Sequence, residues 1–431
     1  MASAFKAPRG TFDVLPDESR RRAELEEHAR RILTAAGYGR IETPAFEPTE
    51  LFARGVGEST DIVRKEMYTF DDGAGRSLTL RPEGTAPVCR AYLEHGMHRL
   101  PQPVKLWYLS SFFRAEAPQR GRYRQFWQVG AEAIGCDSPE ADAELIVLLA
   151  DLLDALGVRG TRLRLSSLGT PETRARYREE LIAYLRAHRD ALAPEVAERI
   201  ELNPMRAFDA GDSRTQQTMR GAPLLLDRLA QEDAEHLAAV RSLLDEAGIH
   251  HELDPTLVRG LDYYTRTVFE FTSDALGAQS GVGGGGRYDG LVQQLGGRPT
   301  PAAGWAAGVE RMLLAAGERP VEREPVDLFV AIDPEPLLAI DQGAGSAAGG
   351  LQRAAFSLAN RARHAGLNAQ LELSGRSLKG QLRHADRIGA RWVAIISDPV
   401  ALTLKDMRSG DQAELEAGAA LERMLAGRRS P

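Results

Sequence analysis

The chain has 431 residues, of which 43% are hydrophobic and 27% are charged, and its mean hydropathy is −0.31. This composition is typical of a soluble globular protein with more than one sizeable core, and at about 150 residues per domain the length predicts roughly three units. The formal net charge of −7 excludes a chain that is basic throughout, so any surface for nucleic acid must be local.

Cysteine usage and the N-terminal segment indicate a cytoplasmic protein. Cys89 and Cys136 form neither a Cys-x-x-Cys pair nor a disulfide framework, which favours a reducing compartment. Residues 1–12 lack the apolar run of a signal peptide. The most apolar long stretch, residues 144–158, is interrupted by two aspartates, so we expect no membrane span. The nine histidines lack metal-ligand spacing, and no metal site made of protein ligands is expected.

Two helices and a set of strands are predicted in the first part of the chain. One helix is expected at about residues 17–36, because Gly37 follows at a helix-terminating position. Another is expected at about 139–156, because Ser138 can cap it and leucines recur at helical spacing. The segments between them are rich in β-formers or alternate in polarity. The expected strands are Ser77–Leu80, Val104–Phe113 and Arg124–Ile134.

A helical insertion, at about residues 170–254, interrupts this strand-rich unit. Its charged segments predict helices. They are Pro171–Arg189, Ala193–Leu202 and Asp233–Gly248. A block of strands and loops is then expected at Val258–Gly286, and a closing helix at Trp305–Ala316. Strands interleaved with helices, without a regular β-α-β rhythm, favour an α+β domain with an antiparallel sheet.

A linker at Gly317–Pro325, which contains two prolines, precedes a second domain. Strands and helices alternate after it, which is typical of a small α/β domain at residues 326–431. The expected elements are a strand ending at Ile332, helices at Gln352–His364 and Ser377–Ile388, and strands at Asn368–Leu373 and Trp392–Ile396. The run Gly343–Gly350 is composed of glycine, alanine and serine alone, which predicts a flexible loop.

Basic residues are concentrated in this second domain. Between Arg353 and Arg391 there are eight lysines and arginines against two acidic residues, a local net charge of +6 in an acidic chain. This favours a polyanion-binding surface. A solvated face of two helices explains the same charges, and charge alone does not decide between the two interpretations.

Residues 113–126 form an arginine-rich segment with a turn, between two predicted strands. Guanidinium groups match phosphate oxygens bidentately, so the segment suits phosphate or RNA binding. A basic hairpin on the surface is the alternative, and the segment by itself leaves both open.

The same segment resembles motif 2 of class II aminoacyl-tRNA synthetases, and Gly308–Arg311 resembles the Gly-x-Glu-Arg of their motif 3. Two longer segments resemble the histidine-specific signatures of histidyl-tRNA synthetases. Leu257–Glu270 reads LVRGLDYYTRTVFE, and Gly284–Leu291 reads GGGRYDGL. The segment LRPEGT at residues 80–85 also matches that family.

Motif 1, the dimer-forming element of the family, is recognisable around Ile41–Pro44, so the resemblance extends from near the N-terminus to about residue 425. It implies a class II catalytic domain with an antiparallel sheet at residues 1–325 and an anticodon-binding α/β domain at 326–431. It further implies a homodimer that activates histidine with ATP, releasing pyrophosphate, and transfers the histidine from the adenylate to the 3′-terminal ribose of tRNA(His).

Adenylate formation drives an anionic carboxylate onto an anionic phosphate, so its site must gather positive charge. By resemblance, the catalytic residues are Arg114, on the α-phosphate, and Arg259, near the histidine carboxylate and the same phosphate. Mg²⁺ would bridge the outer phosphates of ATP. Arg311 and Phe126 would sandwich the adenine, and Glu116 would accept a hydrogen bond from the base.

The resemblance also implies how histidine is bound. Glu83, Thr85 and Gln128 would surround its α-ammonium group. Glu132 and Tyr264 would address the two ring nitrogens, and Arg259 and Tyr263 complete the set. Partners at both nitrogens make the site reject other amino acids, because a wrong side chain leaves those partners unpaired.

Contacts with tRNA are less fully specified. By resemblance, Gln119 and Arg124 lie near the acceptor end. Ala117 stands where the family commonly has a basic residue, which puts the detail of that contact in doubt. The segment from Ile396 to Leu402 in the C-terminal domain is shorter than the family usually has, so anticodon contacts are not assigned to individual residues.

The motifs have two alternative interpretations. The glycines at positions 281, 283 and 286 satisfy Gly-x-Gly-x-x-Gly, but no acidic residue follows at the ribose-binding distance, so we expect close approach to a ligand instead of a dinucleotide site. A synthetase-like regulatory subunit of ATP phosphoribosyltransferase would share the catalytic fold. Such a protein is expected to lose parts of the histidine signatures and the C-terminal domain, both of which are present here.

Overall fold

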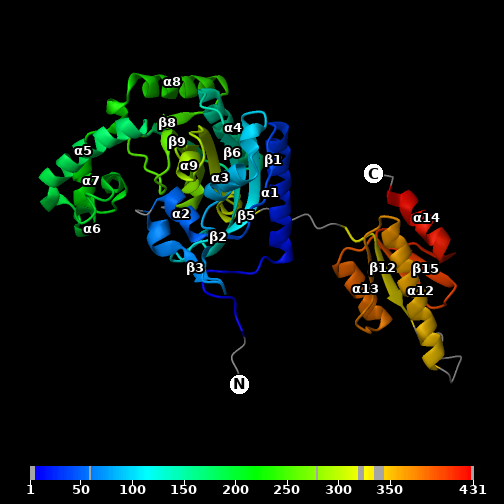
Figure 1. Ribbon diagram of the computed structural model, residues 1–431. Helices are drawn as coiled ribbons and strands as arrows, with labels where there is room; N and C mark the ends of the chain where they lie inside the picture. Colours follow the sequence, from blue (N-terminus) through cyan, green and yellow to red (C-terminus); the bar gives the residue numbers. More distant parts are fainter. Residues whose placement is uncertain (1–4, 58–59, 278–279, 319–324, 334–343, 429–431) are drawn as a thin grey trace. The chain divides into compact units, whose positions relative to one another are not determined.

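The computed structural model describes residues 5–57, 60–277, 280–318, 325–333 and 344–428 (Figure 1). The chain divides into two compact units, residues 1–319 and 320–431, which are treated separately. Within the described parts of the chain, no helix is long and apolar enough to cross a membrane.

An eight-stranded sheet forms the centre of the first unit. Its inner strands are antiparallel, and only the edge pairs β1–β5 and β7–β8 are parallel. The strands, in spatial order, are β1 (Gly39–Arg40), β5 (Val104–Phe113), β6 (Gln125–Ile134), β11 (Ala302–Gly308), β10 (Gly281–Arg287), β9 (Thr265–Ser273), β7 (Thr161–Ser167) and β8 (His251–Leu253). This arrangement confirms the expected α+β class with an antiparallel sheet.

One face of the sheet is covered by three helices. They are α1 (Pro16–Ala35), α4 (Pro139–Ala155) and α10 (Val309–Ala316). Leu25 of α1 and Leu149 of α4 are fully buried against Trp107 and Trp305 of the sheet. Gly37 has a φ of 84°, the left-handed conformation that ends a helix at low cost for glycine.

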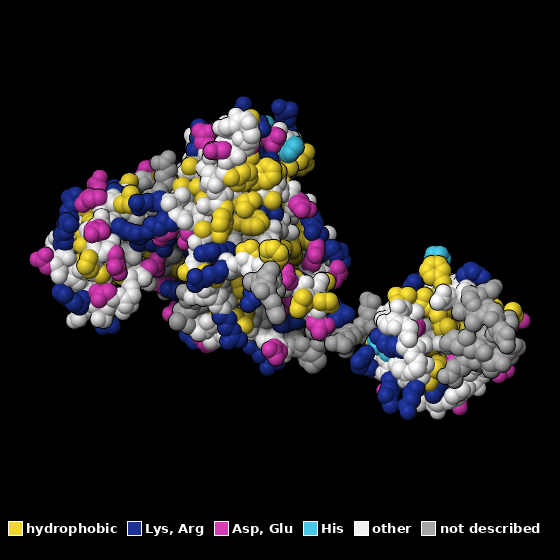
Figure 2. Space-filling view, turned by 90° about the horizontal axis from the view of Figure 1, so that it is seen from below, with side chains coloured by type: hydrophobic (Ala, Val, Ile, Leu, Met, Phe, Trp, Pro, Cys, Tyr) yellow, Lys and Arg dark blue, Asp and Glu magenta, His cyan; other side chains and the backbone are white. Residues whose placement is uncertain are grey.

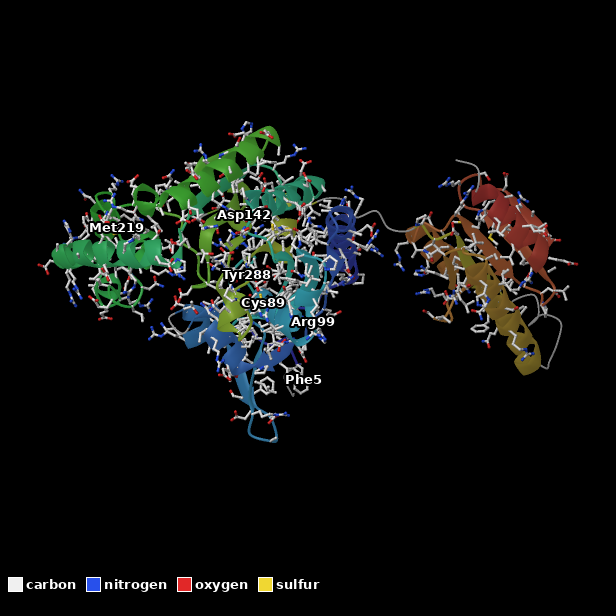
Figure 3. All side chains as sticks on the ribbon, turned by 45° about the horizontal axis from the view of Figure 1, so that its top comes forward. Phe5, Cys89, Arg99, Asp142, Met219 and Tyr288 are labelled. Atoms are coloured by element: carbon white, nitrogen blue, oxygen red, sulfur yellow. The ribbon has the colours of Figure 1, made fainter. Side chains whose placement is uncertain are left out.

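The other face of the sheet carries a second apolar core and the functional site. Helix α3 (Thr85–Glu94) packs Cys89 and Tyr92 against aromatic residues of the sheet and of the loop after residue 257. Cys89 and Tyr288 both lie in the interior of the unit (Figure 3). The smaller elements beside α3 are α2 (Thr49–Val56), η1 (Ile62–Glu66), η2 (Met97–Arg99), α9 (Leu291–Gln294) and the sheet of β2 (Phe46–Pro48), β4 (Ser77–Leu80) and β3 (Tyr68–Asp71).

The segment between β7 and β8 is helical and shares the core of the site. Leu181 and Leu185 pack into the same apolar cluster as Tyr263. Its last helix runs back along α4 and buries Val240 there. The elements are α5 (Pro171–Ala187), η3 (Arg189–Ala191), α6 (Pro194–Ala197), η4 (Pro204–Asp209), α7 (Ser213–Met219), η5 (Leu225–Arg228) and α8 (Gln231–Glu246).

In its described residues, the second unit contains a five-stranded mixed sheet and three helices. Its order is β13 (Ala369–Leu371), β12 (Leu328–Ile332), β14 (Trp392–Ile396), β15 (Ala401–Asp406) and β16 (Gln412–Glu416). Helices α12 (Ala344–His364), α13 (Leu378–Arg387) and α14 (Ala417–Arg428) complete it. Ser377 caps α13 by accepting a hydrogen bond from the backbone N–H of Gly380 at 3.4 Å.

Three expectations for elements were wrong. The expected helix at 305–316 begins only at Val309, because Ala302–Gly308 forms the inner strand β11, whose small residues fit between two neighbouring strands. The expected helix at 193–202 is a single turn, Pro194–Ala197, after which the chain turns to bury Ile200. The run expected as a loop at 343–350 is helical from Ala344, as the first part of α12, which buries Leu351 and Ala355 in the core of the second unit; Gly343 lies outside the described residues.

Candidate active site

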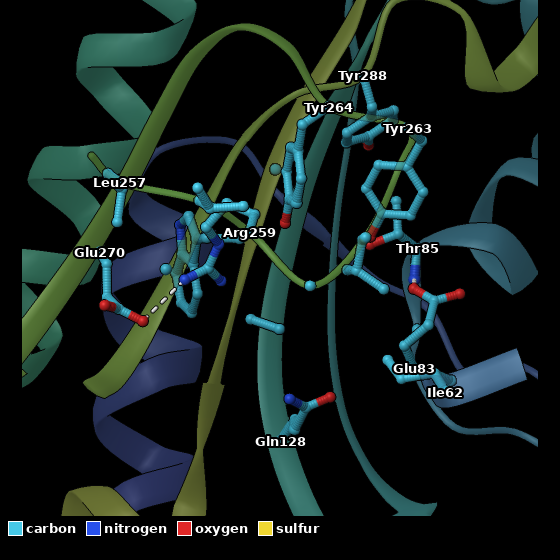
Figure 4. A pocket seen from close by; sticks show the side chains of 18 of the residues that line it. Ile62, Glu83, Thr85, Gln128, Leu257, Arg259, Tyr263, Tyr264, Glu270 and Tyr288 are labelled. Atoms are coloured by element: carbon cyan, nitrogen blue, oxygen red, sulfur yellow. Dashed lines mark hydrogen bonds and ion pairs between the residues drawn. The ribbon is translucent and has the colours of Figure 1, made fainter. Parts of the chain in front are cut away.

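A cavity of about 440 Å³ opens on the face of the sheet that α3 covers. Its lining includes residues of strand β6, of the start of α3 and of the loop Leu257–Tyr264 (Figure 4), together with residues of β7, β9, β10, β11 and η4. Successive residues of a strand point to opposite faces, so Gln128 faces the cavity while Trp127 points to the opposite core. The fold therefore brings together segments that are separated by more than 100 residues in the sequence.

Gln128 and Arg259 present unpaired polar atoms within this region. Oε1 of Gln128 and Nε of Arg259 are buried and have no hydrogen-bond partner among the described residues. Unpaired buried polar atoms are costly, and a ligand that supplies partners removes that cost. Figure 4 shows Gln128, Arg259 and Tyr264 around one open space.

Arg259 is held by a carboxylate that the sequence motifs do not single out. Its Nη1 donates to Oε1 of Glu270 at 2.9 Å, and its side chain is 19% exposed. Burial lowers the pKa of Arg259, but Tyr264 and Glu270 together raise it, so the guanidinium stays charged. Arg164 of β7 lies 3.5 Å from the other oxygen of Glu270. The pairing fixes the guanidinium at the cavity wall.

Glu83 and Thr85 lie at the N-terminal end of α3. The carboxylate of Glu83 accepts hydrogen bonds from the backbone N–H of Thr85 at 2.6 Å and of Ala86 at 3.0 Å. Burial raises the pKa of Glu83, whereas these backbone donors and Arg114 act in the opposite direction. A buried carboxylate fixed in this way suits a cationic ammonium ligand.

Glu132 is placed differently from the other predicted histidine-binding residues. It does not line the cavity and is fully buried, accepting hydrogen bonds from the hydroxyls of Thr85 at 2.9 Å, Tyr288 at 2.7 Å and Tyr108 at 3.3 Å. Burial raises its pKa to about 8. Gly304 of β11 lies opposite Glu132 and lines the cavity, and a Cβ there would overlap the Glu132 carboxylate. Glu132 therefore lies directly beneath the cavity wall.

A second cavity, of about 210 Å³, adjoins the first. The two share Arg114, Gln128 and Arg259 in their walls. The second cavity is also lined by the residues expected around adenine, namely Glu116, Phe126 and Arg311. The guanidinium carbon of Arg114 lies 5.3 Å from the ring centre of Phe126, and its Nε donates to the carbonyl of Pro82 at 2.9 Å.

The glycines of β10 have two structural roles. Gly281, Gly283 and Gly284 line the second cavity, consistent with close approach to a ligand. Gly285 and Gly286 instead allow close packing, since a Cβ at either would overlap the backbone of a neighbouring strand. The Gly-x-Gly-x-x-Gly pattern lies within a β-strand and not at a strand-to-helix turn, so it is not a dinucleotide fingerprint.

The two residues expected at the tRNA acceptor end do not line either cavity. Gln119 forms a β-bridge with Arg122 in the turn of the arginine-rich hairpin. Arg124 packs against the N-terminal segment: its backbone N–H donates to the carbonyl of Gly10 at 2.7 Å, and its Nη1 donates to that of Arg9 at 3.5 Å.

Several cavity residues were missed by the sequence reasoning. Glu270 is the last residue of the first histidine signature, and Tyr288 lies within the second. Their position in these signatures could have identified them as cavity residues. Arg206 and Asp209 come from η4 of the helical insertion, for which no motif was available. Arg122 lies in the arginine-rich segment and lines both cavities.

Comparison with known proteins decides the family. Residues 10–312 match the family model described as histidyl-tRNA synthetase, and residues 338–426 match that of an anticodon-binding domain. The chain belongs to the histidyl-tRNA synthetase family. Among its relatives are the histidine–tRNA ligases of Desulfitobacterium hafniense (strain DSM 10664 / DCB-2), 46% identical over 96% of each chain, and of Halorhodospira halophila (strain DSM 244 / SL1), 48% identical over 94% of this chain and 93% of the relative.

Solved structures agree with this assignment. The apo histidyl-tRNA synthetase of S. aureus superposes with a TM-score of 0.78 at 35% identity, covering 98% of this chain and all of the other. A protein of Bacillus halodurans C, described as an ATP phosphoribosyltransferase regulatory subunit/histidyl-tRNA synthetase, has a TM-score of 0.64 at 22% identity and covers 92% of this chain. That likeness shows the fold alone. The full-length identity to ligases therefore separates this synthetase-family chain from the regulatory interpretation.

Proposed function

We propose that this chain is a histidine–tRNA ligase that activates histidine with ATP and charges tRNA(His). In the first step a histidine carboxylate oxygen attacks the α-phosphorus of ATP and pyrophosphate leaves. In the second, a hydroxyl of the 3′-terminal ribose attacks the carbonyl carbon of the adenylate and AMP leaves. The observation that carries the proposal is that two adjoining cavities share Arg114, Gln128 and Arg259. An amino acid in one cavity and ATP in the other would meet at these residues.

The shared wall fits the charge requirement of the first step. The attacking carboxylate and the α-phosphate are both anionic, and two fixed guanidinium groups can stabilise the charge that gathers between them. We assign that role to Arg114 and Arg259. Arg259 exchanges part of its pairing with Glu270 for the ligand, while its unpaired Nε supplies a further donor.

Adenine is assigned to the second cavity. Phe126 offers a ring face, Arg311 a planar cation, and Glu116 an acceptor for the exocyclic amino group. Mg²⁺ enters in this proposal with ATP, bound to its outer phosphates. No group of three His, Cys, Asp or Glu side chains in the described parts of the chain could hold a metal ion, so the phosphates would supply ligands.

Histidine is assigned to the first cavity. Its ammonium group would lie by Glu83, Thr85 and Gln128, and its ring by Tyr263 and Tyr264. We further propose that Glu132 addresses a ring nitrogen through the space that Gly304 leaves at the cavity wall. The support is the position of the Glu132 carboxylate directly beneath that glycine.

The two units are assigned different parts of the tRNA. Residues 1–325, with the insertion at about 170–254, would hold the acceptor end, with Gln119 and Arg124 near it; residues 326–431 would hold the anticodon. In support of this, Lys379, Arg383 and Arg387 recur at every fourth position of α13, so they share one face, and all three are exposed.

We also propose a homodimer formed through the region of motif 1, in the cytoplasm. Hydrophobic side chains are exposed on the face seen in Figure 2. Beside the motif 1 segment, Phe46 is 50% exposed and Phe70 42% exposed, with ring centres 6.1 Å apart. Exposed aromatic pairs of this kind are typical of interfaces. Sedimentation of the full chain as a monomer at micromolar concentration would contradict the dimer.

Histidine-dependent exchange of labelled pyrophosphate into ATP tests the proposed activity. The purified full chain should support exchange with histidine and not with glutamine or phenylalanine, since these leave the partners of the ring nitrogens unpaired. Binding of histidine without exchange would overturn the proposal and favour a regulatory role. Charging of tRNA(His) is then measured on the same preparation.

A further inference from the structure

The helical insertion contributes a cation to the wall of the first cavity. Arg206 lies in η4 of the insertion and lines that cavity, but it does not line the second one. A Cβ added to Gly260 would lie 3.4 Å from Nη2 of Arg206, so the guanidinium rests against the backbone one residue after Arg259. The insertion therefore reaches the loop that carries the proposed catalytic arginine.

The ion pairs of the cavity leave Arg206 available to an anion. Arg164 forms ion pairs with Asp254 and Glu270, and Arg259 forms one with Glu270. Among the described residues, Arg206 has one carboxylate partner, Asp209, at 3.1 Å, and the Asp209 side chain is 44% exposed. A guanidinium has five N–H donors, and an exposed pair of this type is weak, so most of these donors can turn to a ligand.

The position of Arg206 selects which anion it can meet. Phosphates of ATP and the histidine carboxylate must come together at the wall that both cavities share, where Arg114, Arg122 and Arg259 lie. Arg206 is absent from that wall. The remaining anion of the reaction is the tRNA backbone, which has to bring its terminal ribose into the first cavity to reach the adenylate carbonyl.

We propose, resting on the proposed function, that Arg206 binds the phosphodiester next to the terminal nucleotide of tRNA(His). It thereby positions the 3′-terminal ribose for attack on the adenylate. Arg206 acts on the transfer step and not on histidine activation. The insertion would thus complete the site for the second half-reaction.

The test separates the two half-reactions in the R206A variant of the full chain. Transfer is measured by single-turnover quench-flow, from preformed histidyl-adenylate to tRNA(His), and activation by pyrophosphate exchange. Loss of one charge-assisted contact should slow transfer about 10- to 100-fold. Exchange should stay within about twofold of the unchanged protein, a margin far smaller than one such contact. R206K, which keeps the charge without the fork, should recover part of the transfer rate.

R186A is the matched control, because Arg186 lies on α5 of the same insertion, pairs with Glu201 at 2.7 Å and does not line the cavity. It should transfer normally. Normal transfer by R206A, an equal fall in exchange and transfer, or an equal fall in R186A would each overturn the inference. If R206A does not fold, R206Q carries the same comparison. An unchanged protein that shows no exchange would instead refute the proposed function itself.

Discussion

At the scale of single residues, ion pairs and hydrogen bonds hold the charged side chains of the proposed site in fixed orientations. Arg259 and Glu270 hold each other at 2.9 Å, and Glu83 is held by backbone donors at the start of α3. Each group is oriented before a ligand arrives. Preorganised charges of this kind stabilise a transition state without paying for reorientation during the reaction.

Arg259→Ala should abolish most histidine activation. The substitution removes a fixed cation from the place where negative charge gathers, and we expect pyrophosphate exchange to fall about 100- to 1000-fold. Arg162→Ala is the matched control, because Arg162 is an exposed arginine of β7 paired with Asp274, away from the cavity. Exchange at a near-normal rate in the Arg259 variant would remove this residue from the mechanism.

Glu132 should make folding stability depend on pH. The folded protein holds this proton up to a pKa of about 8, whereas the unfolded chain releases it near the ordinary value of 4.5. The folded state therefore binds more protons between these values, and the free energy of unfolding should fall as pH rises, by at most about 1.4 kcal/mol per pH unit.

Urea unfolding of the ligand-free protein at pH 5 to 8 measures this dependence. Glu132→Gln should flatten it, because the amide cannot titrate. Glu180→Gln should not, since the exposed Glu180 is paired with Arg228, which lowers its pKa away from this pH range. The same slope in the Glu132 variant as in the unchanged protein would contradict a titrating carboxyl at this position.

The predicted site residues were found mostly through the family resemblance, and the structure shows which information the sequence lacked. Residues that line the cavities from quoted motifs, such as Gln128 and Arg311, were named in advance. Glu132 was named without its position beneath Gly304, because a strand's register against its neighbours is a long-range property. Arg206 was missed because its approach to the cavity depends on how the insertion folds back.

At the scale of elements, a buried ion network joins the end of strand β10 to two helices. Arg287 at the end of β10 is fully buried and lies 2.6 Å from Asp142 of α4. Asp142 also pairs with His236 of α8 at 2.8 Å. The next residue, Tyr288, donates to Glu132. The network therefore anchors the strand end next to the histidine cavity.

Arg287→Met should destabilise the first unit by about 3–5 kcal/mol, because it leaves Asp142 buried without its main partner. Combining it with Asp142→Leu should cost much less than the sum of the single changes. Urea unfolding of the three variants measures this. The exposed pair Arg162–Asp274 is the control and should show close to no effect. Additive costs for Arg287 and Asp142 would contradict a coupled buried pair.

Elements with strong local signals were predicted from the sequence. The strands Ser77–Leu80 and Val104–Phe113 have the expected bounds. Helix α1 differs from the expected helix by one residue at each end, and α4 by one residue at its C-terminal end only. The inner strand β11 was mistaken for part of a helix, since a strand of alanine and glycine buried between two others has no alternation in polarity. Its identity depends on pairing with β6 and β10, which local patterns do not encode.

At the scale of the whole molecule, an acidic chain has to bind an anionic partner. The formal net charge is −7, yet the second unit carries a local excess of basic residues. Six of the eight lysines and arginines between residues 353 and 391 are exposed. Local concentration of charge can attract a polyanion even where the total charge repels it.

Replacing Lys379, Arg383 and Arg387 together by alanine should weaken tRNA binding and leave histidine activation unchanged. Three lost phosphate contacts should lower kcat/KM for tRNA(His) at least about tenfold and make its dependence on salt shallower by roughly two to three charges. The control replaces Arg20, Arg30 and Arg31, three exposed arginines of α1, with the same change in net charge. Charging is measured at several salt concentrations, with pyrophosphate exchange alongside. If both triple variants lose the same fraction of charging, general electrostatic attraction explains the result; a loss confined to the α13 variant places the tRNA on that helix, because only the position of the removed charge differs.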